Sequence, residues 1–135
     1  MMLACLEGQK IMQEVAPLLY EKQKELFDVV QSKWKFGGMF TSTISNYNIA
    51  APYHIDNANI VGSVNMIMTK RSNSKGGCLT IPDFNITIES CDNSMIVYPA
   101  WKSIHGVTPI IPLTKDGYRN SHIFYPLKAF LNEHI

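Results

Sequence analysis

The spacing of apolar side chains changes once along the chain, near Gly37-Gly38. Before that point, residues 8–33 carry apolar side chains at intervals of three or four, with charged side chains largely on the other face, which predicts an amphipathic helical segment. Pro17 should break or kink this segment, or begin a second helix. The recurring apolar residues are Ile11, Val15, Leu19, Leu26 and Val30.

After Gly38 the apolar period falls to two, and segments rich in β-branched and aromatic residues alternate with turn-forming residues, as in strands. The expected strands are residues 40–47, 60–69, 79–81, 84–89 and 95–98, a strand bearing His105, and a last strand from Arg119 to Tyr125. Residues 70–77 are expected to form a basic, turn-forming loop. Such short strands after one helical segment predict a mainly β protein: a jelly roll or squashed barrel with the helical segment packed on it.

The length of 135 residues suits one domain around one core. We therefore expect a single domain at 1–135, with a helical segment at about 8–33 and a β core at about 40–127. Apolar residues at 46% and charged residues at 17% indicate a globular protein rather than a disordered one. The net charge of +1 gives no general attraction to nucleic acid or acidic membranes, so such a partner would need a local basic patch.

The cysteines and the hydropathy bear on the compartment. Cys5, Cys78 and Cys91 are odd in number and form no C-x-x-C pair, which argues against a disulfide framework and against a thiolate zinc site. No apolar run approaches the roughly twenty residues that a membrane span requires. We expect a soluble, cytoplasmic protein with no membrane partner.

The candidate chemistry begins at Pro52-Tyr53-His54-Ile55-Asp56. His54 and Asp56 are two residues apart, so in an extended segment they point to the same side and can bind one ion. With His105 they would supply two imidazoles and one carboxylate, the ligand set of non-heme Fe(II) oxygenases, which leaves open positions for cosubstrate and dioxygen. The alternative is a coincidental polar loop. A jelly roll suits the metal hypothesis, because its mouth brings distant strand ends together.

The last expected strand adds a possible anion site. Arg119, Ser121 and Tyr125 recur at period two and therefore share one face. If Arg119 points into the barrel it should bind a carboxylate, because a guanidinium can fork onto that group and an unpaired buried charge is costly. The alternative is an exposed arginine in a turn at Gly117-Tyr118.

Taken together, these residues resemble the Fe(II)/2-oxoglutarate dioxygenases with a double-stranded β-helix. More narrowly, the chain resembles the TET/JBP branch, which oxidises the 5-methyl group of pyrimidines in DNA. The likeness covers about residues 15–127. It rests on these stretches: Ala16-Pro17-Leu18-Leu19-Tyr20, Thr41-Ser42-Thr43, His54-x-Asp56, Gly76-Gly77-Cys78-Leu79, His105-Gly106-Val107-Thr108-Pro109, Arg119-x-Ser121 and Tyr125.

The resemblance implies roles for individual residues. Fe(II) would be held by His54, Asp56 and His105, with 2-oxoglutarate and O2 as cosubstrates. Arg119 would bind the distal carboxylate of 2-oxoglutarate with help from Ser121.

The same resemblance implies two contacts with a substrate base. Asn59 would contact a flipped base and Tyr125 would stack on it; a turn-capping role for Asn59 and a core role for Tyr125 stay open. The chain has Leu127 where members of the branch place a further base-contacting His.

The implied reaction hydroxylates a C–H bond while 2-oxoglutarate is converted to succinate and CO2. A DNA substrate would have to be single-stranded or flipped to reach the metal. Lys70, Arg71 and Lys75 are the candidates for phosphate contacts, or else form a solvated hairpin tip. His122 and His134 are expected to lie outside the site.

Two alternatives to base hydroxylation in DNA remain. One is a 2-oxoglutarate oxygenase acting on a free nucleotide, a peptide or another small molecule. The other is a non-catalytic, cupin-like binding module.

Overall fold

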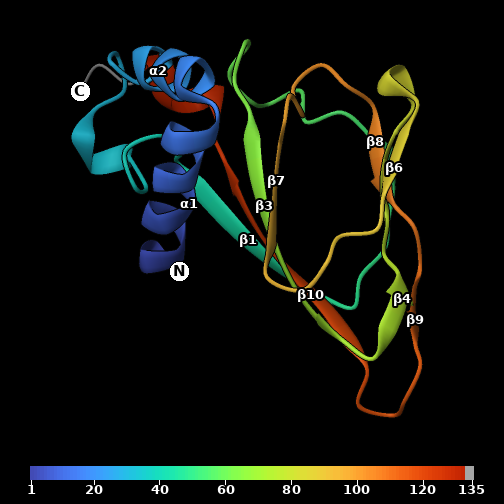
Figure 1. The fold of residues 1–135 in the computed structure, drawn as a ribbon. Helices are drawn as coiled ribbons and strands as arrows, with labels where there is room; N and C mark the ends of the chain where they lie inside the picture. The colour runs from blue at the N-terminus through green and yellow to red at the C-terminus, as the bar shows by residue number, and fades with distance from the viewer. Residues whose placement is uncertain (133–135) are drawn as a thin grey trace.

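The computed structural model describes residues 1–132, in which two helices precede ten strands (Figure 1). His134 lies outside the described residues. The helices and strands are α1 (Met2–Val15), α2 (Pro17–Leu26), β1 (Ser42–Tyr47), β2 (Ala51–His54), β3 (Asn65–Ser72), β4 (Ser74–Gly76), β5 (Leu79–Ile81), β6 (Ile86–Ile88), β7 (Ser94–Tyr98), β8 (His105–Val107), β9 (Ile110–Pro112) and β10 (Tyr118–Tyr125). Short 3-10 turns lie at Ser32–Trp34, Pro82–Phe84 and Lys128–Asn132.

The strands form two facing antiparallel sheets, one in the order β1-β10-β3-β7 and the other β2-β8-β5-β6; β4 and β9 pair at one end. The register places four isoleucines in a row across the first sheet, and three of them pack with Leu79 and Ile81 of the second sheet. The four are Ile44, Ile123, Ile67 and Ile96. This arrangement confirms the predicted fold class, a mainly β jelly roll of the double-stranded β-helix type.

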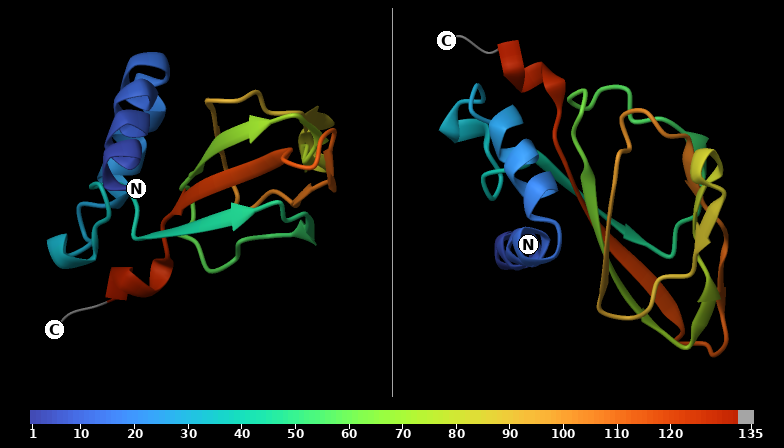
Figure 2. Two further views of the ribbon diagram at one scale, coloured as in Figure 1. Left: turned by 90° about the horizontal axis from the view of Figure 1, so that it is seen from below. Right: turned by 45° about the horizontal axis from the view of Figure 1, so that its top comes forward.

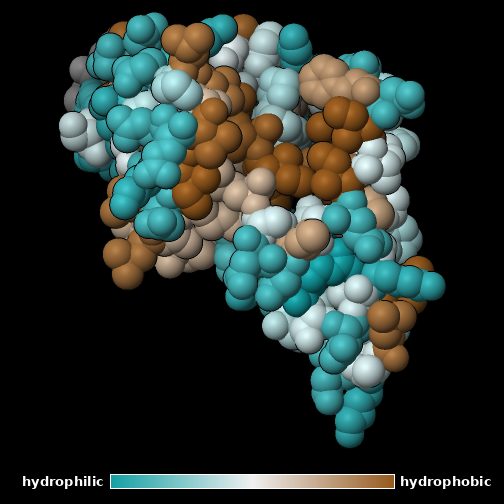
Figure 3. All heavy atoms as spheres, in the orientation of Figure 1, coloured by the Kyte–Doolittle hydropathy of each residue, from teal (hydrophilic) through white to brown (hydrophobic). Residues whose placement is uncertain are grey.

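The helices cover the outer face of the first sheet, so the molecule has three layers (Figure 2). Met12 and Cys5 of α1 pack with Met66 of β3 and Phe124 of β10, all at most 2% exposed. Burying each such large side chain contributes roughly 1.5–3 kcal/mol. In Figure 3 apolar side chains gather beside the helices, whereas the end of the molecule near β4 and β9 is largely hydrophilic.

The helical prediction was partly wrong. Pro17 begins α2, as one of the options stated, but α1 begins at Met2 and α2 ends at Leu26 rather than near residue 33. The buried side of α1 carries Gly8, whereas Ile11 and Val15 are 38% and 78% exposed. This face of α1 packs closely on the sheet: a Cβ at Gly8 would lie 2.6 Å from Met66 Sδ.

Several strand predictions also needed correction. Residues 60–64 are not extended, because Gly62 has φ +87° and the Ser63 amide and hydroxyl both donate to the Ile60 carbonyl. The strand begins at Asn65 and continues to Ser72, so Lys70 and Arg71 are strand residues rather than loop residues.

The remaining differences lie in short strands. The 3-10 turn at Pro82–Phe84 and the positive φ of Asn85 reduce the strand expected at 84–89 to Ile86–Ile88. Strands β4 and β9 were not predicted, and β2 was expected only as an extended segment that carries His54 and Asp56.

All three cysteines are free thiols, which agrees with the prediction of no disulfide framework. Among the helices of residues 1–132, none has the length and apolarity to cross a membrane. The cytoplasmic location stays a prediction.

Candidate metal centre

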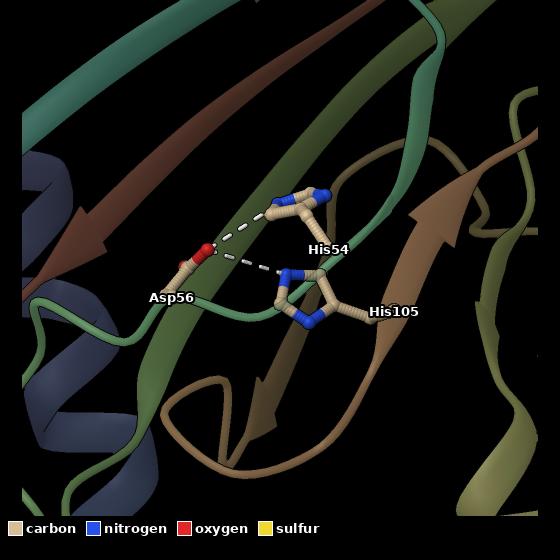
Figure 4. Close-up of side chains that lie close together, drawn as sticks. All are labelled: His54, Asp56 and His105. Carbon is tan, nitrogen blue, oxygen red and sulfur yellow. Dashed lines mark ion pairs between the residues drawn. The ribbon is translucent and has the colours of Figure 1, made fainter.

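Strands β2 and β8 bring the two histidines together. They pair antiparallel with His54 opposite His105, and the ring centroids are 4.3 Å apart. Asp56 follows two residues after the end of β2, where its amide donates to the Ala100 carbonyl at 3.0 Å. Figure 4 shows both rings directed toward the Asp56 carboxylate.

One carboxylate oxygen is shared between the two rings. Asp56 Oδ1 lies 3.3 Å from His54 Nε2 and 3.6 Å from His105 Nε2. One ligand atom from each of the three residues lies within 4.8 Å of the others, which is close enough for a single ion to be bound by all three. His105 is the most buried of the three at 3% exposure, whereas His54 is 43% exposed, so the cluster is reached from one side.

The other ring nitrogens fix the protonation of the histidines. His54 Nδ1 lies 2.8 Å from the Pro52 carbonyl oxygen, and His105 Nδ1 lies 2.8 Å from the Ser103 carbonyl oxygen. A carbonyl can only accept, so each Nδ1 carries the proton and a neutral ring keeps a lone pair on Nε2. Backbone contacts of this kind typically orient metal-binding histidines. Two such rings and a carboxylate therefore fit a divalent transition metal.

Burial lowers the pKa of His105, and the positive charge of a protonated His54 would act in the same direction. The Ser103 carbonyl and the Asp56 carboxylate oppose this shift. The ring is therefore held neutral, which is the state that binds metal.

Two residues behind the cluster were not predicted from the sequence. Asn65 is 1% exposed and donates through Nδ2 to Asp56 Oδ2 at 2.9 Å. The Tyr98 ring contacts the His105 ring edge-on, with the ring centroids 5.0 Å apart. Burial raises the pKa of Tyr98, and the negative charge of Asp56 raises it further. A polar residue directly before the apolar run Met66-Ile67-Met68 was the signal that could have identified Asn65.

A cavity of about 410 Å³ lies between the two sheets beside the cluster. Its walls include all seven predicted site residues, which the fold brings together from three segments of the chain. They are His54, Asp56, Asn59, His105, Arg119, Ser121 and Tyr125.

Arg119 is buried against this cavity at 3% exposure, so it is not the exposed turn residue of the alternative hypothesis. Its Nε has no hydrogen-bond partner, and no carboxylate within residues 1–132 forms an ion pair with it. Burial lowers its pKa, the charge of Arg71 adds to this effect and Cys78 opposes it. A buried cation without a counter-charge on the wall of a cavity fits a bound carboxylate.

Glycine makes room for this arginine. Gly77 has φ +61°, and a Cβ there would overlap Arg119 Cδ and lie 2.9 Å from Nε. Two hydrogen bonds to Asn48 hold the backbone of Arg119. The Arg119 amide donates to Asn48 Oδ1 at 2.8 Å, and the Asn48 amide donates to the Arg119 carbonyl at 2.9 Å.

Further polar residues line the cavity, two of them on neighbouring strands of the first sheet. Ser121 of β10 pairs with Asn46 of β1, and both line the cavity. Asn46 was missed, although it lies at period two from Ile44 on the same strand. Asn59 forms a bridge with Leu127, and both also line the cavity beside Tyr125.

The basic residues considered for phosphate contacts lie on β3 and β4. Lys70 is 3.9 Å from Asp92, and Arg71 donates to the Ser90 carbonyl and to Ser74 Oγ, whereas Lys75 is exposed. Their contact with phosphate stays a prediction. His122 bonds to Ser45 Oγ through Nδ1 at 2.8 Å and does not line the cavity, as predicted.

No protein-family model and no curated protein matches this sequence. A solved structure, NgTET1 in complex with 5mC DNA, is similar to this chain with a TM-score of 0.71 and 14% sequence identity. The similarity covers 93% of this chain and 50% of the NgTET1 chain, so this chain spans about half the length of that protein. At this identity the likeness concerns the fold. The chain therefore has the fold of a TET protein, with a His-Asp-His cluster suited to a metal ion inside it.

Proposed function

We propose that this chain is an Fe(II)- and 2-oxoglutarate-dependent dioxygenase that hydroxylates a C–H bond. One observation carries the proposal: a single cavity holds a two-histidine, one-carboxylate cluster and a buried arginine that has no counter-ion among residues 1–132. The cluster accounts for a metal, and the arginine accounts for a carboxylate-bearing cosubstrate. The TET-like fold agrees with this pairing.

When bound, Fe(II) supplies the oxidation, in which O2 and 2-oxoglutarate give succinate and CO2 while the substrate C–H becomes C–OH. The protein positions these groups. His54, Asp56 and His105 hold the metal from one side, and Arg119 orients the distal carboxylate, with Ser121 beside it. Apolar walls from both sheets, including Ile67 and Leu79, keep water from the reacting groups.

For the substrate, we propose the 5-methyl group of a pyrimidine base in DNA that is single-stranded or flipped. Arg119 is the one Lys or Arg among the cavity-lining residues of the described chain. Once it binds a carboxylate, no basic residue remains in the cavity for a phosphate, so the part of the substrate that enters is uncharged. A base satisfies this condition with its phosphates outside, whereas a free nucleotide held by its phosphates inside does not.

Two wall residues suit a flat base. Tyr125 lies on the same strand face as Arg119 and Ser121, and stacking on an aromatic side chain is worth roughly 1–3 kcal/mol per base. Asn59 adds an amide to the wall near Asp56. The similar NgTET1 structure is a complex with 5mC DNA, which agrees with this choice.

The test measures succinate release and base oxidation together. The protein is incubated with Fe(II), 2-oxoglutarate and oligonucleotides containing thymine or 5-methylcytosine, single- or double-stranded, and the bases are analysed by mass spectrometry. We expect a hydroxymethylated base in single strands, none with Asp56→Ala, and uncoupled succinate release with Tyr125→Ala.

Two other results would each contradict part of the proposal. Succinate release with a peptide or a neutral small molecule but with no oligonucleotide would refute the DNA substrate. Binding of metal and 2-oxoglutarate without succinate release from any substrate would indicate a binding module instead of an enzyme.

A further inference from the structure

Two buried amide side chains form a chain of hydrogen bonds that ends on the metal-binding carboxylate. Asn59 donates through Nδ2 to Asn65 Oδ1 at 2.8 Å, and Asn65 donates through Nδ2 to Asp56 Oδ2 at 2.9 Å. Asn59 is 3% exposed and Asn65 is 1% exposed. We call Asn59 and Asn65 the amide relay.

Chemistry fixes the direction of both bonds. An ionised carboxylate accepts hydrogen bonds but cannot donate them, so Asn65 must turn its NH2 group toward Asp56. This leaves the carbonyl oxygen of Asn65 toward Asn59, which must then offer its own NH2 group. Turning either amide over would bring two acceptors or two donors together, so the relay has one consistent orientation.

The relay also gives the two carboxylate oxygens of Asp56 different neighbours. Oδ2 is occupied by Asn65, and Oδ1 is the oxygen close to both histidine Nε2 atoms. Asp56 lies beyond the end of β2, in a turn where its carbonyl accepts from the Asn59 amide at 3.0 Å. Because Asp56 lies outside any strand, a contact from a neighbouring rigid strand is needed to fix the rotation of its carboxylate.

Asn65 is well placed to give that contact. It is the first residue of β3 and pairs with Tyr98 of β7, whose ring in turn contacts His105. At the far end of the relay, Asn59 is bridged to Leu127 on the cavity wall. The relay therefore connects the wall of the cavity to the metal ligand.

We propose that Asn65 is a positioning residue that, braced by Asn59, holds Asp56 so that the metal is bound through Oδ1 alone. This inference deepens the proposed function, because it assumes that His54, Asp56 and His105 bind a metal. Contacts to the outer side of metal ligands commonly change metal affinity by tenfold to a hundredfold.

The experiment measures Mn(II) affinity by calorimetry in the parent chain, Asn65→Leu, Asn59→Ala and the double variant. Asn65→Leu keeps the size of the side chain and should weaken binding by about tenfold or more. Asn59→Ala should weaken it less, and the double variant should bind no more weakly than Asn65→Leu alone. Co(II) bound to Asn65→Leu should also show an altered visible spectrum, because the carboxylate is free to rotate.

Gln23→Leu is the matched control. Gln23 is also a 1% exposed amide with hydrogen bonds to the Met39 and Val64 backbone, but it lies in the helical layer. It should lower the melting temperature and leave Mn(II) affinity unchanged. Parental affinity in Asn65→Leu, or independent addition of the Asn59 and Asn65 effects, would overturn the proposal.

A second measurement needs no metal. In the metal-free protein, Asp56→Ala should shift the side-chain amide NMR signals of Asn65 and, through it, Asn59, but not those of Gln23. Unshifted Asn65 and Asn59 signals would refute the relay even if the parent binds metal. If the parent binds no Mn(II), the proposed function fails, and the NMR result still decides whether the relay exists.

Discussion

Arg119 should reduce the stability of the ligand-free fold, because its charge is buried without an ion-pair partner among the described residues 1–132. The side chain is 3% exposed, and Nε lacks any hydrogen bond. Arg119→Met keeps much of the apolar stem and removes the charge. We expect it to raise the free energy of unfolding of the ligand-free protein by about 1–4 kcal/mol, the range found when apolar residues replace buried ion pairs.

The same substitution should impair use of 2-oxoglutarate. A hydrogen bond to a charged group contributes about 1.5–3 kcal/mol, which corresponds to roughly tenfold to a hundredfold in the concentration of 2-oxoglutarate needed for half-maximal turnover. Arg119→Lys should fall in between, because an ammonium group cannot fork onto both carboxylate oxygens. Metal affinity should survive both changes.

The assays are urea unfolding without ligands and succinate release at increasing 2-oxoglutarate. Lys70→Met is the control, because Lys70 lies on β3 outside the cavity and forms an exposed ion pair with Asp92 at 3.9 Å. An exposed ion pair contributes little, so this change should leave the stability nearly unchanged and keep the parental 2-oxoglutarate dependence. A less stable Arg119→Met, or an unchanged 2-oxoglutarate dependence, would refute the reasoning.

Three further predictions follow from single contacts. Gly77→Ala should raise the 2-oxoglutarate requirement, measured by succinate release, because the new Cβ would overlap Arg119 Cδ; a parental requirement would show that Arg119 tolerates the displacement. Burial lowers the pKa of His105, so below about pH 6.5 the unfolded chain binds a proton at this ring more readily than the folded protein does. The free energy of unfolding of the metal-free protein, measured by urea titration, should therefore fall as the pH drops below that value, and it should fall less steeply in His105→Leu. Equal slopes in the two proteins would contradict this. The Cys5 side chain is 0% exposed, and burial raises the pKa of its thiol to about 11. A thiol reagent at pH 8 should therefore modify Cys91 and Cys78 first, and Cys5 only when the protein unfolds.

The sequence predicted what depends on local spacing. Arg119, Ser121 and Tyr125 recur at period two, so they had to share a face wherever their strand lay. His54 and Asp56 were expected to do the same, but Asp56 lies beyond the end of β2, so strand alternation is not what brings them together. The adjacency of His54 and His105 is a contact between distant strands, which was expected from their shared ligand chemistry and from a jelly-roll mouth, and the structure confirms it.

What the sequence did not predict depends on tertiary packing. The buried face of α1 carries Gly8 and Gln9 beside Cys5 and Met12, and neither a glycine nor a glutamine adds to an apolar periodicity. Strand β2 contains Pro52 and is largely exposed, so it lacks the apolar alternation of a strand. Asn65 and Asn46 were missed because polar residues within a strand usually indicate a solvated face, and only the facing sheet shows that they line or support a cavity.

The most direct test of the proposed enzyme is a crystal structure prepared without oxygen, with Fe(II) and 2-oxoglutarate. We predict one metal ion bound by His54 Nε2, His105 Nε2 and Asp56 Oδ1, with the distal carboxylate of 2-oxoglutarate on the Arg119 guanidinium. A metal ion bound elsewhere, or 2-oxoglutarate bound away from Arg119, would contradict the account.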